Sequence, residues 1–488
     1  MPFQQGFSIG AYPYPMEIRQ PDGSVLTIRN HGDEWYNWTT TKDGYRILKS
    51  DAGYFEYATQ LKSGDIASSG IRASDPGERT PDEEDFLSNT TKNIGVSKEE
   101  KQKKRNQRYQ PLLKSSLMST YFPSEGKPNL LVILADFNDT QPTYSTSDFD
   151  AFMNEEGYND KGSFKDYYEE VSGGELTVNS TVTQWVQVPG NHDYYGPKEK
   201  WGEFALEAVK AAAEAGVDFS RFDNDGDGVV EGVAIIHQGA GEEVTGDADD
   251  IWSHSYSFSS EGVEESKRTF DGVVVNQYTV QPEWRTNAAE MNTIGVICHE
   301  FGHNLGLIDF YDTNEESYAG TGVWDIMAAG AYNGSPTGSS PAHHNPFSKN
   351  ELDWVDVSTI DQSGSIELDP VYNTGEVLRV NSPVENEYLL LENRQETGFD
   401  SALPGPGMLV YHVDGNLIEE RRSTNDINTE EHQGFYPIAA DGYINLPSCP
   451  FPGSADVTEL TDDSDPAMET WDGQPFNRSI TSIEMTNE

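Results

Sequence analysis

Apolar and polar residues follow different patterns in successive parts of this chain of 488 residues. Between about residues 120 and 354, short continuous apolar runs of strand length occur together with a segment of helical composition. The apolar runs cover residues 129–137, 233–237 and 273–280. They predict buried strands, and residues 200–215, which stop before Gly216, predict a helix. This order predicts a twisted sheet backed by helices.

Both flanks of this region have β-rich patterns. Residues 1 to about 95 contain short alternating segments separated by turn dipeptides such as Asp22-Gly23, which predicts a small β-rich domain. From Ile366 onward, alternating segments and Pro/Gly turns occur with almost no helical signal, which predicts a C-terminal β-sandwich. We therefore expect an α+β protein, which at this length can form three domains. The expected domains are residues 1–110 with a linker at their end, 120–354 and 355–488.

One segment of the central region carries most of the chemical information. Residues 299–309 read HEFGHNLGLID, an H-E-x-x-H-x-x-G-x-x-D pattern. Two histidines four positions apart on a helix, here His299 and His303, project from one face and can bind one metal ion. Neutral imidazoles are good zinc ligands, and a third ligand with an oxygen donor leaves the fourth position open for water.

The other residues of this pattern have defined roles in such a site. Gly306 stands where the helix must end, because glycine tolerates the left-handed conformation. The turn would bring Asp309 back toward the metal as the third ligand, with Asp312 as the alternative. Glu300 can take a proton from a metal-bound water as that water attacks a carbonyl. The segment predicts a zinc-dependent hydrolase, because a solvated surface helix would not be half apolar.

A second segment agrees with this prediction. Residues 322–330, GVWDIMAAG, resemble the Met-turn of metzincin peptidases, in which a methionine lies beneath the metal ligands. Met327 would be this methionine; without the preceding motif, an apolar core turn would be the better interpretation. Tyr332 could hydrogen-bond a developing oxyanion, although an ordinary half-buried tyrosine is the simpler interpretation.

A third motif suggests calcium. Residues 223–228 read DNDGDG, which resembles a calcium loop because hard oxygen ligands converge around a sharp turn. The candidate ligands are Asp223, Asp225, Asp227 and, at the ninth place, Glu231. The twelfth position is Ala234 and not glutamate, so the loop is not an EF-hand, and a metal-free Asp-Gly turn is the alternative. The acidic segment 242–250 offers either a second calcium site or, more simply, a solvated loop.

Together these motifs resemble the immune inhibitor A family of bacterial metallopeptidases. The resembling segments are residues 299–312, 322–334, 341–354, 162–174, 251–256 and 387–414. The resemblance implies a secreted zinc endopeptidase of zincin or metzincin type, with an N-terminal propeptide and often with calcium. It also implies the zinc ligands His299, His303 and Asp309, with Glu300 as the base. Cys298 departs from the family pattern, in which a small residue such as alanine is expected.

Composition excludes several other functions. Asp and Glu number 83 against 32 Lys and Arg, a net charge of −51. Nucleic acids and anionic membranes are therefore not expected partners, because phosphate binding needs basic surface. No apolar run is long enough to predict a membrane span. The chain has two cysteines, Cys298 and Cys449; they could form one disulfide, but we expect Cys298 to be a buried free thiol.

A basic segment separates the N-terminal and central parts. Six of the 32 basic residues fall within residues 98–108, which favours an exposed, cleavable linker between a propeptide and a catalytic domain. A solvated helix without a processing role is the alternative. No cysteine precedes Cys298, so a cysteine switch is excluded. A carboxylate or histidine of residues 31–34 is a candidate to approach the zinc, with an ordinary polar turn as the alternative.

We therefore expect a secreted zinc endopeptidase, made as a zymogen, with protein or peptide substrates and its own propeptide as inhibitor. Residues 1–4 lack the basic and apolar start of a signal segment, so we expect that segment to be missing from this sequence. The alternative is a catalytically silent, calcium-stabilised adhesion or binding protein on a peptidase scaffold, against which the intact Glu300 argues. A zinc amidase acting on cell-wall peptides would differ only in substrate.

Overall fold

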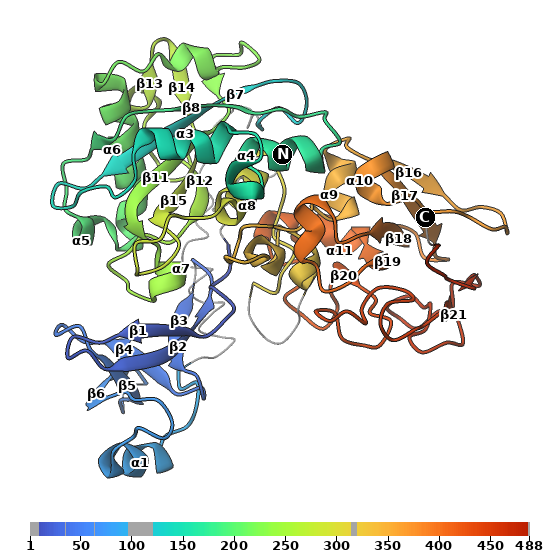
Figure 1. Cartoon of the computed structure of the whole chain (residues 1–488), viewed down its shortest axis with the longest axis horizontal. Coiled ribbons are helices and arrows are strands. Elements are labelled where there is room, and N and C mark those ends of the chain that lie inside the picture. The colour runs from blue at the N-terminus through green and yellow to red at the C-terminus, as the bar shows by residue number, and fades with distance from the viewer. Residues whose placement is uncertain (1–8, 35, 63, 96–120, 314–319, 487–488) are drawn as a thin grey trace.

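The computed structural model describes residues 9–34, 36–62, 64–95, 121–313 and 320–486. The chain forms an N-terminal sheet, a central mixed region and a C-terminal sheet, in this order (Figure 1). The predicted mixture of helices and strands is thus confirmed. The basic segment 98–108 lies outside the described residues, so the cleavable linker stays a prediction.

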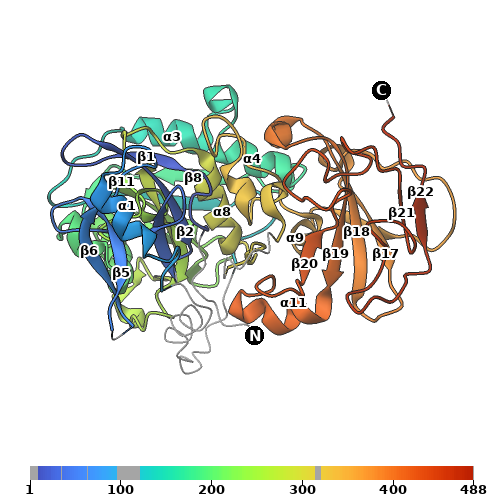
Figure 2. The same ribbon diagram turned by 90° about the horizontal axis from the view of Figure 1, so that it is seen from below.

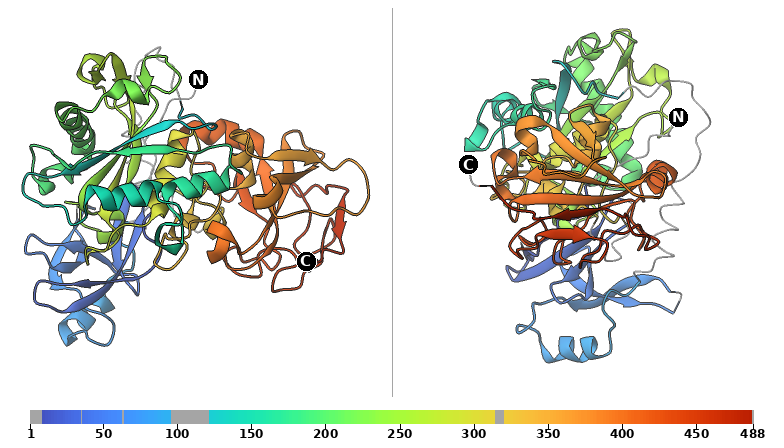
Figure 3. Two further views of the ribbon diagram at one scale, coloured as in Figure 1. Left: turned by 45° about the horizontal axis from the view of Figure 1, so that its top comes forward. Right: turned by 90° about the vertical axis from the view of Figure 1, so that its right-hand side faces the viewer.

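The N-terminal part is an antiparallel meander in which each strand pairs with the next. Its strands are β1 (Met16–Arg19), β2 (Val25–Gly32), β3 (Asn37–Thr41), β4 (Arg46–Lys49), β5 (Phe55–Gln60) and β6 (Ile66–Arg72). The helix α1 (Pro81–Ser88) follows and is absent from the sequence-based prediction. Thr80 and Glu83 form a reciprocal capping box around Pro81, a start signal that the sequence does contain. The meander projects from the other two parts (Figure 3).

The central sheet has the strand order β12-β15-β11-β7-β8, with β9 also paired to β7, and only β12 runs antiparallel to its neighbour. The strands are β7 (Asn129–Asp136), β8 (Asn179–Val182), β9 (Val186–Gln187), β11 (Val233–Ala240), β12 (His254–Ser257) and β15 (Gln277–Trp284). The strands predicted over 129–137 and 233–237 are confirmed as β7 and β11.

The single strand predicted over 273–280 is wrong. The chain forms β14 (Val273–Val275), breaks at Asn276 and then forms β15. The reason is that β14 belongs to a separate small sheet with β10 (Val229–Val230) and β13 (Thr269–Phe270). An apolar run alone does not show that the chain leaves one sheet for another.

Alternate residues of β7 enter two different cores, which explains why its apolar run is continuous. Leu130, Val132 and Leu134 pack on the side of α3 (Thr146–Asn154), α4 (Phe164–Val171) and α8 (Ile294–Asn304). Leu131, Ile133 and Ala135 pack on the side of α6 (Trp201–Glu214). The predicted helix is therefore α6, and Gly216 beyond its end has the left-handed φ of +92°. Shorter helices are α5 (His192–Tyr195) and α7 (Glu242–Thr245).

The C-terminal part contains a five-stranded sheet and a two-stranded ribbon. The sheet consists of β16 (Asp356–Thr359), β17 (Glu376–Asn381), β18 (Glu387–Arg394), β19 (Gly407–Asp414) and β20 (Phe435–Pro437), and the ribbon of β21 (Glu459–Thr461) and β22 (Ser479–Thr481). The β-rich character agrees with the prediction, while the sandwich arrangement stays a prediction. Its helices are α10 (Val371–Thr374) and α11 (Gly415–Arg421), and α9 (Pro346–Glu351) directly precedes this part.

The expectation of almost no helix in this part is wrong at α11. The side chain of Asp414 accepts hydrogen bonds from the backbone nitrogens of Asn416 and Leu417 and so caps the helix. Leu417 and Ile418 are its buried residues. A helix of two turns with two apolar residues is too short for a helical pattern of apolar positions to be recognised in the sequence.

The central and C-terminal parts share one core. Phe301 of α8, Leu390 of β18 and Tyr411 of β19 belong to the same buried cluster. Figure 2 shows α8 between the central strands and the C-terminal sheet. The N-terminal meander instead has a small core of its own, around Leu26, Ile28 and Tyr57. Among the described residues, no helix has the length and apolar character needed to cross a membrane.

Candidate metal centre

The helix α8 carries the predicted ligands His299 and His303 and is buried along its whole length. The Tyr168 hydroxyl donates a hydrogen bond to the Cys298 carbonyl at 2.5 Å and so ties α4 to the helix. Cys298 and Cys449 are both buried and free, as expected of Cys298. A Cβ on Gly302 would lie 2.5 Å from the Met327 sulfur, so only glycine allows Met327 to pack this closely against the helix.

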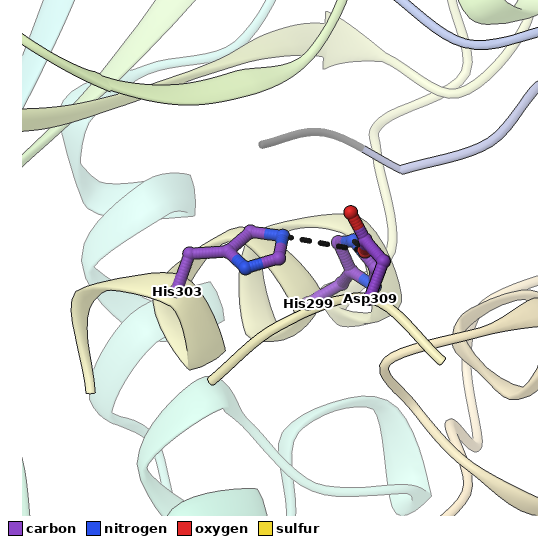
Figure 4. Close-up of side chains that lie close together, drawn as sticks. All are labelled: His299, His303 and Asp309. Carbon is purple, nitrogen blue, oxygen red and sulfur yellow. Dashed lines mark ion pairs between the residues drawn. The ribbon is translucent and has the colours of Figure 1, made fainter. Parts of the chain in front are cut away.

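The three predicted ligands come together (Figure 4). His299 Nε2 lies 3.2 Å, and His303 Nε2 3.5 Å, from Oδ1 of Asp309. Each histidine also uses its other nitrogen: His299 Nδ1 lies 2.8 Å from the Ile326 carbonyl, and His303 Nδ1 lies 2.9 Å from the Leu307 carbonyl. Because a carbonyl only accepts, both Nδ1 atoms carry the proton, and both Nε2 lone pairs are directed at one point.

The chain turns back to Asp309 as expected, since Gly306 has a φ of +95°. Burial opposes ionisation of Asp309, but the positive charge that the adjacent imidazoles carry when protonated outweighs this effect and lowers the pKa of Asp309 to about 2. Burial lowers the pKa of His303 and so favours the neutral imidazole that binds metals. Asp312 is buried but is not part of this group.

This donor set fits a zinc ion. Among the described residues, His299 Nε2 and Asp309 Oδ1 are buried atoms without a hydrogen-bond partner, although they face each other. Two imidazole nitrogens and one carboxylate oxygen are the ligand types that zinc takes in sites with an open fourth position. The arrangement can therefore hold the metal that the sequence predicts.

Met327 lies in a turn that the chain fixes on both sides. Its carbonyl accepts a hydrogen bond from Phe310 N at 2.9 Å, and its own N–H donates to Asp325 Oδ1 at 3.1 Å. Asp325 is buried and also accepts a hydrogen bond from Asn345. The methionine is thus held under α8 by the segment that follows the third ligand.

Glu300 is fully buried and contacts residues near the start of the chain. The backbone N–H of Ile9 donates to Glu300 Oε1 at 2.9 Å. Burial raises the pKa of Glu300 well above its usual value, and the negative charge of Asp309 raises it further. The Tyr332 hydroxyl donates to the Gly10 carbonyl at 2.9 Å, so Tyr332 is buried against the same segment. The backbone of Ile9 and Gly10 carries both contacts, and a sequence contains no signal for them.

Residues 31–34, the candidates to approach the metal, are not part of the metal-binding group. His31 stacks on Trp38 and bonds to Thr40. Glu34 is buried, and its charge contributes to the raised pKa of Glu300. The hydrogen bond to the predicted base comes from Ile9 N, and an approach of residues 31–34 to the zinc stays a prediction.

In the predicted calcium loop, three of the four candidate residues come together: Asp223, Asp225 and Asp227. Glu231 is turned to the loop backbone, where its carboxylate accepts hydrogen bonds from Asn224 N at 2.9 Å and Asp225 N at 3.1 Å. Glu231 therefore supports the shape of the loop from inside.

The expectation of a solvated loop over 242–250 is wrong at its start. Glu242 and Glu243 are buried. The Glu243 carboxylate accepts hydrogen bonds from Ser253 Oγ at 2.6 Å and Ser253 N at 3.1 Å. The N-terminal part covers the backbone: Asn30 Nδ2 donates to the Val244 carbonyl at 2.8 Å, and Tyr12 N donates to the Glu243 carbonyl at 3.2 Å. Burial raises the pKa of both carboxyl groups to about 7. Lys49 of β4 adds an ion pair with Asp247 at the same surface.

Residues 135–358 match the family model described as immune inhibitor A peptidase M6, catalytic domain. Immune inhibitor A of Bacillus thuringiensis subsp. alesti is 34% identical over 242 residues, which cover 41% of this chain and 34% of that protein. The pre-pro-metalloprotease PrtV of Vibrio cholerae serotype O1 is 33% identical over 224 residues, which cover 39% of this chain and 23% of that protein. The matches thus span about a third and about a quarter of these relatives' lengths.

The matched region contains both histidines, the buried glutamate between them and the aspartate that faces them. This chain therefore carries, over residues 135–358, a catalytic domain of the immune inhibitor A peptidase family.

Proposed function

We propose that this protein is a secreted zinc-dependent endopeptidase that is made in a latent form. One observation supports this most strongly. His299, His303 and Asp309 direct three buried donor atoms at one point beside a buried glutamate, within residues that match a peptidase catalytic domain. A catalytically silent relative would need none of this arrangement, and loss of Glu300 would be the simplest route to silence.

The residues around this point support a hydrolytic mechanism. When bound, zinc would polarise the scissile carbonyl and lower the pKa of its water toward about 7. Glu300 would accept a proton from the attacking water and pass it to the leaving amine. Its Oε2 atom makes no hydrogen bond to any described residue and is the oxygen that can receive this proton. Met327 would form the apolar floor of the site, as in a Met-turn.

Latency is supported by the contacts of residues 9–12, which we call the N-terminal segment. It contacts the proposed base through Ile9 N and the proposed oxyanion stabiliser Tyr332 through the Gly10 carbonyl. Trp252 Nε1 donates to the Ile9 carbonyl at 2.9 Å, and Tyr12 packs edge-on against the Tyr332 ring. A substrate that needs the same two groups would compete with this segment, so we propose that it acts as the inhibitory part of a propeptide.

The proposed function also includes a division into three domains and a bound calcium ion. We assign residues 1–110 to the propeptide and its linker, 120–354 to a zincin-type catalytic domain and 355–488 to a C-terminal β-sandwich. The carboxylates of Asp223, Asp225 and Asp227 would bind calcium and stiffen the loop ahead of β11. The name of one relative, pre-pro-metalloprotease, describes a precursor, and we propose a precursor form for this chain too.

The test measures zinc and cleavage together. The full-length parent is compared with trimmed parent, trimmed Glu300→Ala and a trimmed control variant, each cut by limited trypsin digestion near residues 103–108. All are assayed for bound zinc and for cleavage of an unfolded protein. Glu290→Ala is the matched control, because Glu290 is an exposed glutamate paired with Arg285. We expect one zinc per chain throughout, cleavage by the trimmed parent and the control, and little cleavage by the full-length chain or Glu300→Ala. Equal turnover by Glu300→Ala, or a parent without zinc, would end the proposal.

A further inference from the structure

We propose that Asn425, which belongs to the C-terminal part, is a positioning residue for the metal centre: it holds Asp309 in the orientation that binds zinc. The inference rests on the zinc site of the proposed function and goes beyond its ligands. It makes the C-terminal part a component of the metal centre.

The side-chain amide of Asn425 contacts Asp309 twice. Asn425 Oδ1 accepts a hydrogen bond from the Asp309 backbone N–H at 2.9 Å, and Asn425 Nδ2 donates to Asp309 Oδ2 at 2.6 Å. The two hydrogen bonds fix the backbone and the carboxylate of the same residue. The second has an ionised acceptor in a buried place, which makes it one of the stronger kinds of hydrogen bond.

These contacts determine which oxygen of Asp309 faces the metal. Because Oδ2 is engaged by Asn425, Oδ1 is the oxygen that lies 3.2 Å from His299 Nε2 and 3.5 Å from His303 Nε2. A flipped amide would place its oxygen against the carboxylate and its NH2 group against the Asp309 N–H. Only the observed orientation of Asn425 satisfies both contacts.

Asp309 needs such an anchor. It lies beyond the end of α8, in a stretch that is neither helix nor strand. Asn425 itself is well fixed: it is buried, and its carbonyl accepts a hydrogen bond from Thr313 Oγ1 at 3.1 Å. Its backbone has a φ of +50°, a left-handed conformation that asparagine tolerates better than most residues.

Two further hydrogen bonds join the C-terminal part to the backbone near the metal centre. Asn428 Nδ2 donates to the Phe310 carbonyl at 2.8 Å, and Arg394 Nη1 donates to the Trp324 carbonyl at 3.1 Å. The C-terminal part thus holds the backbone next to the third ligand and the backbone that leads to Met327. Only Asn425 contacts a proposed ligand side chain among these three residues.

The variant Asn425→Gly tests the proposal, because glycine removes the amide and keeps the left-handed backbone without strain. Asn386→Gly is the matched control: Asn386 lies in the same part of the chain, has a left-handed φ of +64°, and its side-chain amide donates to Asn416 Oδ1 at 3.3 Å. Zinc affinity is measured in the full-length chain by competition with a chelator. Cobalt(II) absorption reports the ligand geometry, and thermal unfolding of the metal-free protein reports stability.

We expect Asn425→Gly to bind zinc about 10- to 100-fold more weakly, the usual effect of losing a partner that orients a ligand, with an altered cobalt spectrum. Asn386→Gly should keep a zinc affinity and a cobalt spectrum near those of the parent. Should Asn425→Gly yield little folded protein, it and the parent are prepared and assayed in sucrose, which favours the folded state without restoring the amide.

Unchanged zinc affinity and spectrum in a folded Asn425 variant would overturn the proposal, as would an equal loss of affinity in Asn386→Gly. A parent that binds no zinc would overturn both this inference and the zinc site. A parent that binds zinc while its trimmed form cleaves nothing would refute the peptidase proposal, and the loss of affinity in Asn425→Gly would still support the positioning role.

Discussion

Replacing Ile9 with alanine should partly activate the full-length protein. The Ile9 side chain is 1% exposed and packs in the core that contains α8. The substitution keeps the backbone contacts of the N-terminal segment and removes only this burial. When the N-terminal segment leaves the catalytic domain, the Ile9 side chain is exposed to water. The substitution therefore destabilises the bound segment relative to the released segment by about 1.5–3 kcal/mol. Because about 1.4 kcal/mol is a factor of ten, the fraction of open molecules should rise on the order of 10- to 100-fold.

The assay is the initial rate of cleavage of a quenched fluorescent peptide by zinc-loaded, untrimmed protein. Ile235→Ala is the control, since Ile235 is equally buried but packs on the α6 side of the central sheet, away from α8. The rate of Ile9→Ala should rise and that of Ile235→Ala should not. The reasoning is refuted if Ile9→Ala stays as inactive as the untrimmed parent while trimmed Ile9→Ala is fully active. A rise in both variants would point to general loosening.

Three other results are expected. In trimmed protein, Glu300→Gln should lose about 10²- to 10⁴-fold in turnover and keep its zinc; turnover near that of the parent would contradict the role of the base. Arg394 is buried between Glu392 and Asp400, so Arg394→Met should cost about 3–5 kcal/mol in urea unfolding by leaving these carboxylates unpaired, and a cost below about 1 kcal/mol would contradict this. Burial raises the pKa of Glu243 from 4.5 to about 7, because the buried carboxyl group is more stable when neutral. Its contribution to the free energy of unfolding is therefore complete below about pH 4.5 and is lost as the pH rises through about 7. Glu243→Gln should remove up to about 3 kcal/mol of this pH dependence, compared between about pH 5 and about pH 8, and an unchanged pH profile would be the contrary result.

The sequence was most informative where function depends on neighbours along the chain. The spacing of His299 and His303 is a property of one helix, and Gly306 sets the turn to Asp309 through its own backbone, so all three could be placed in advance. The burial of both faces of β7 was also predictable, because a continuous apolar run implies burial on both sides of a strand.

Other features depend on contacts that no local pattern contains. Asn425 lies 116 positions from Asp309, and Ile9 reaches Glu300 through a backbone N–H that every residue except proline has. The pair Glu242-Glu243 reads as solvated, because acidic residues are seldom buried. Its burial follows from contacts with Ser253 and with the N-terminal meander, which the sequence of that pair cannot show. The helix α1, in contrast, could have been predicted, because the residues of its capping box, Thr80 and Glu83, are visible in the sequence.

The most direct test of the zinc centre is the anomalous scattering of zinc in crystals of the full-length, zinc-loaded protein. We expect one strong peak about 2.0–2.1 Å from Nε2 of His299 and of His303, and about 2.0–2.2 Å from Oδ1 of Asp309. This peak should disappear in His303→Ala. A zinc peak elsewhere in the chain, or a peak at α8 with Asp312 in place of Asp309, would contradict this expectation.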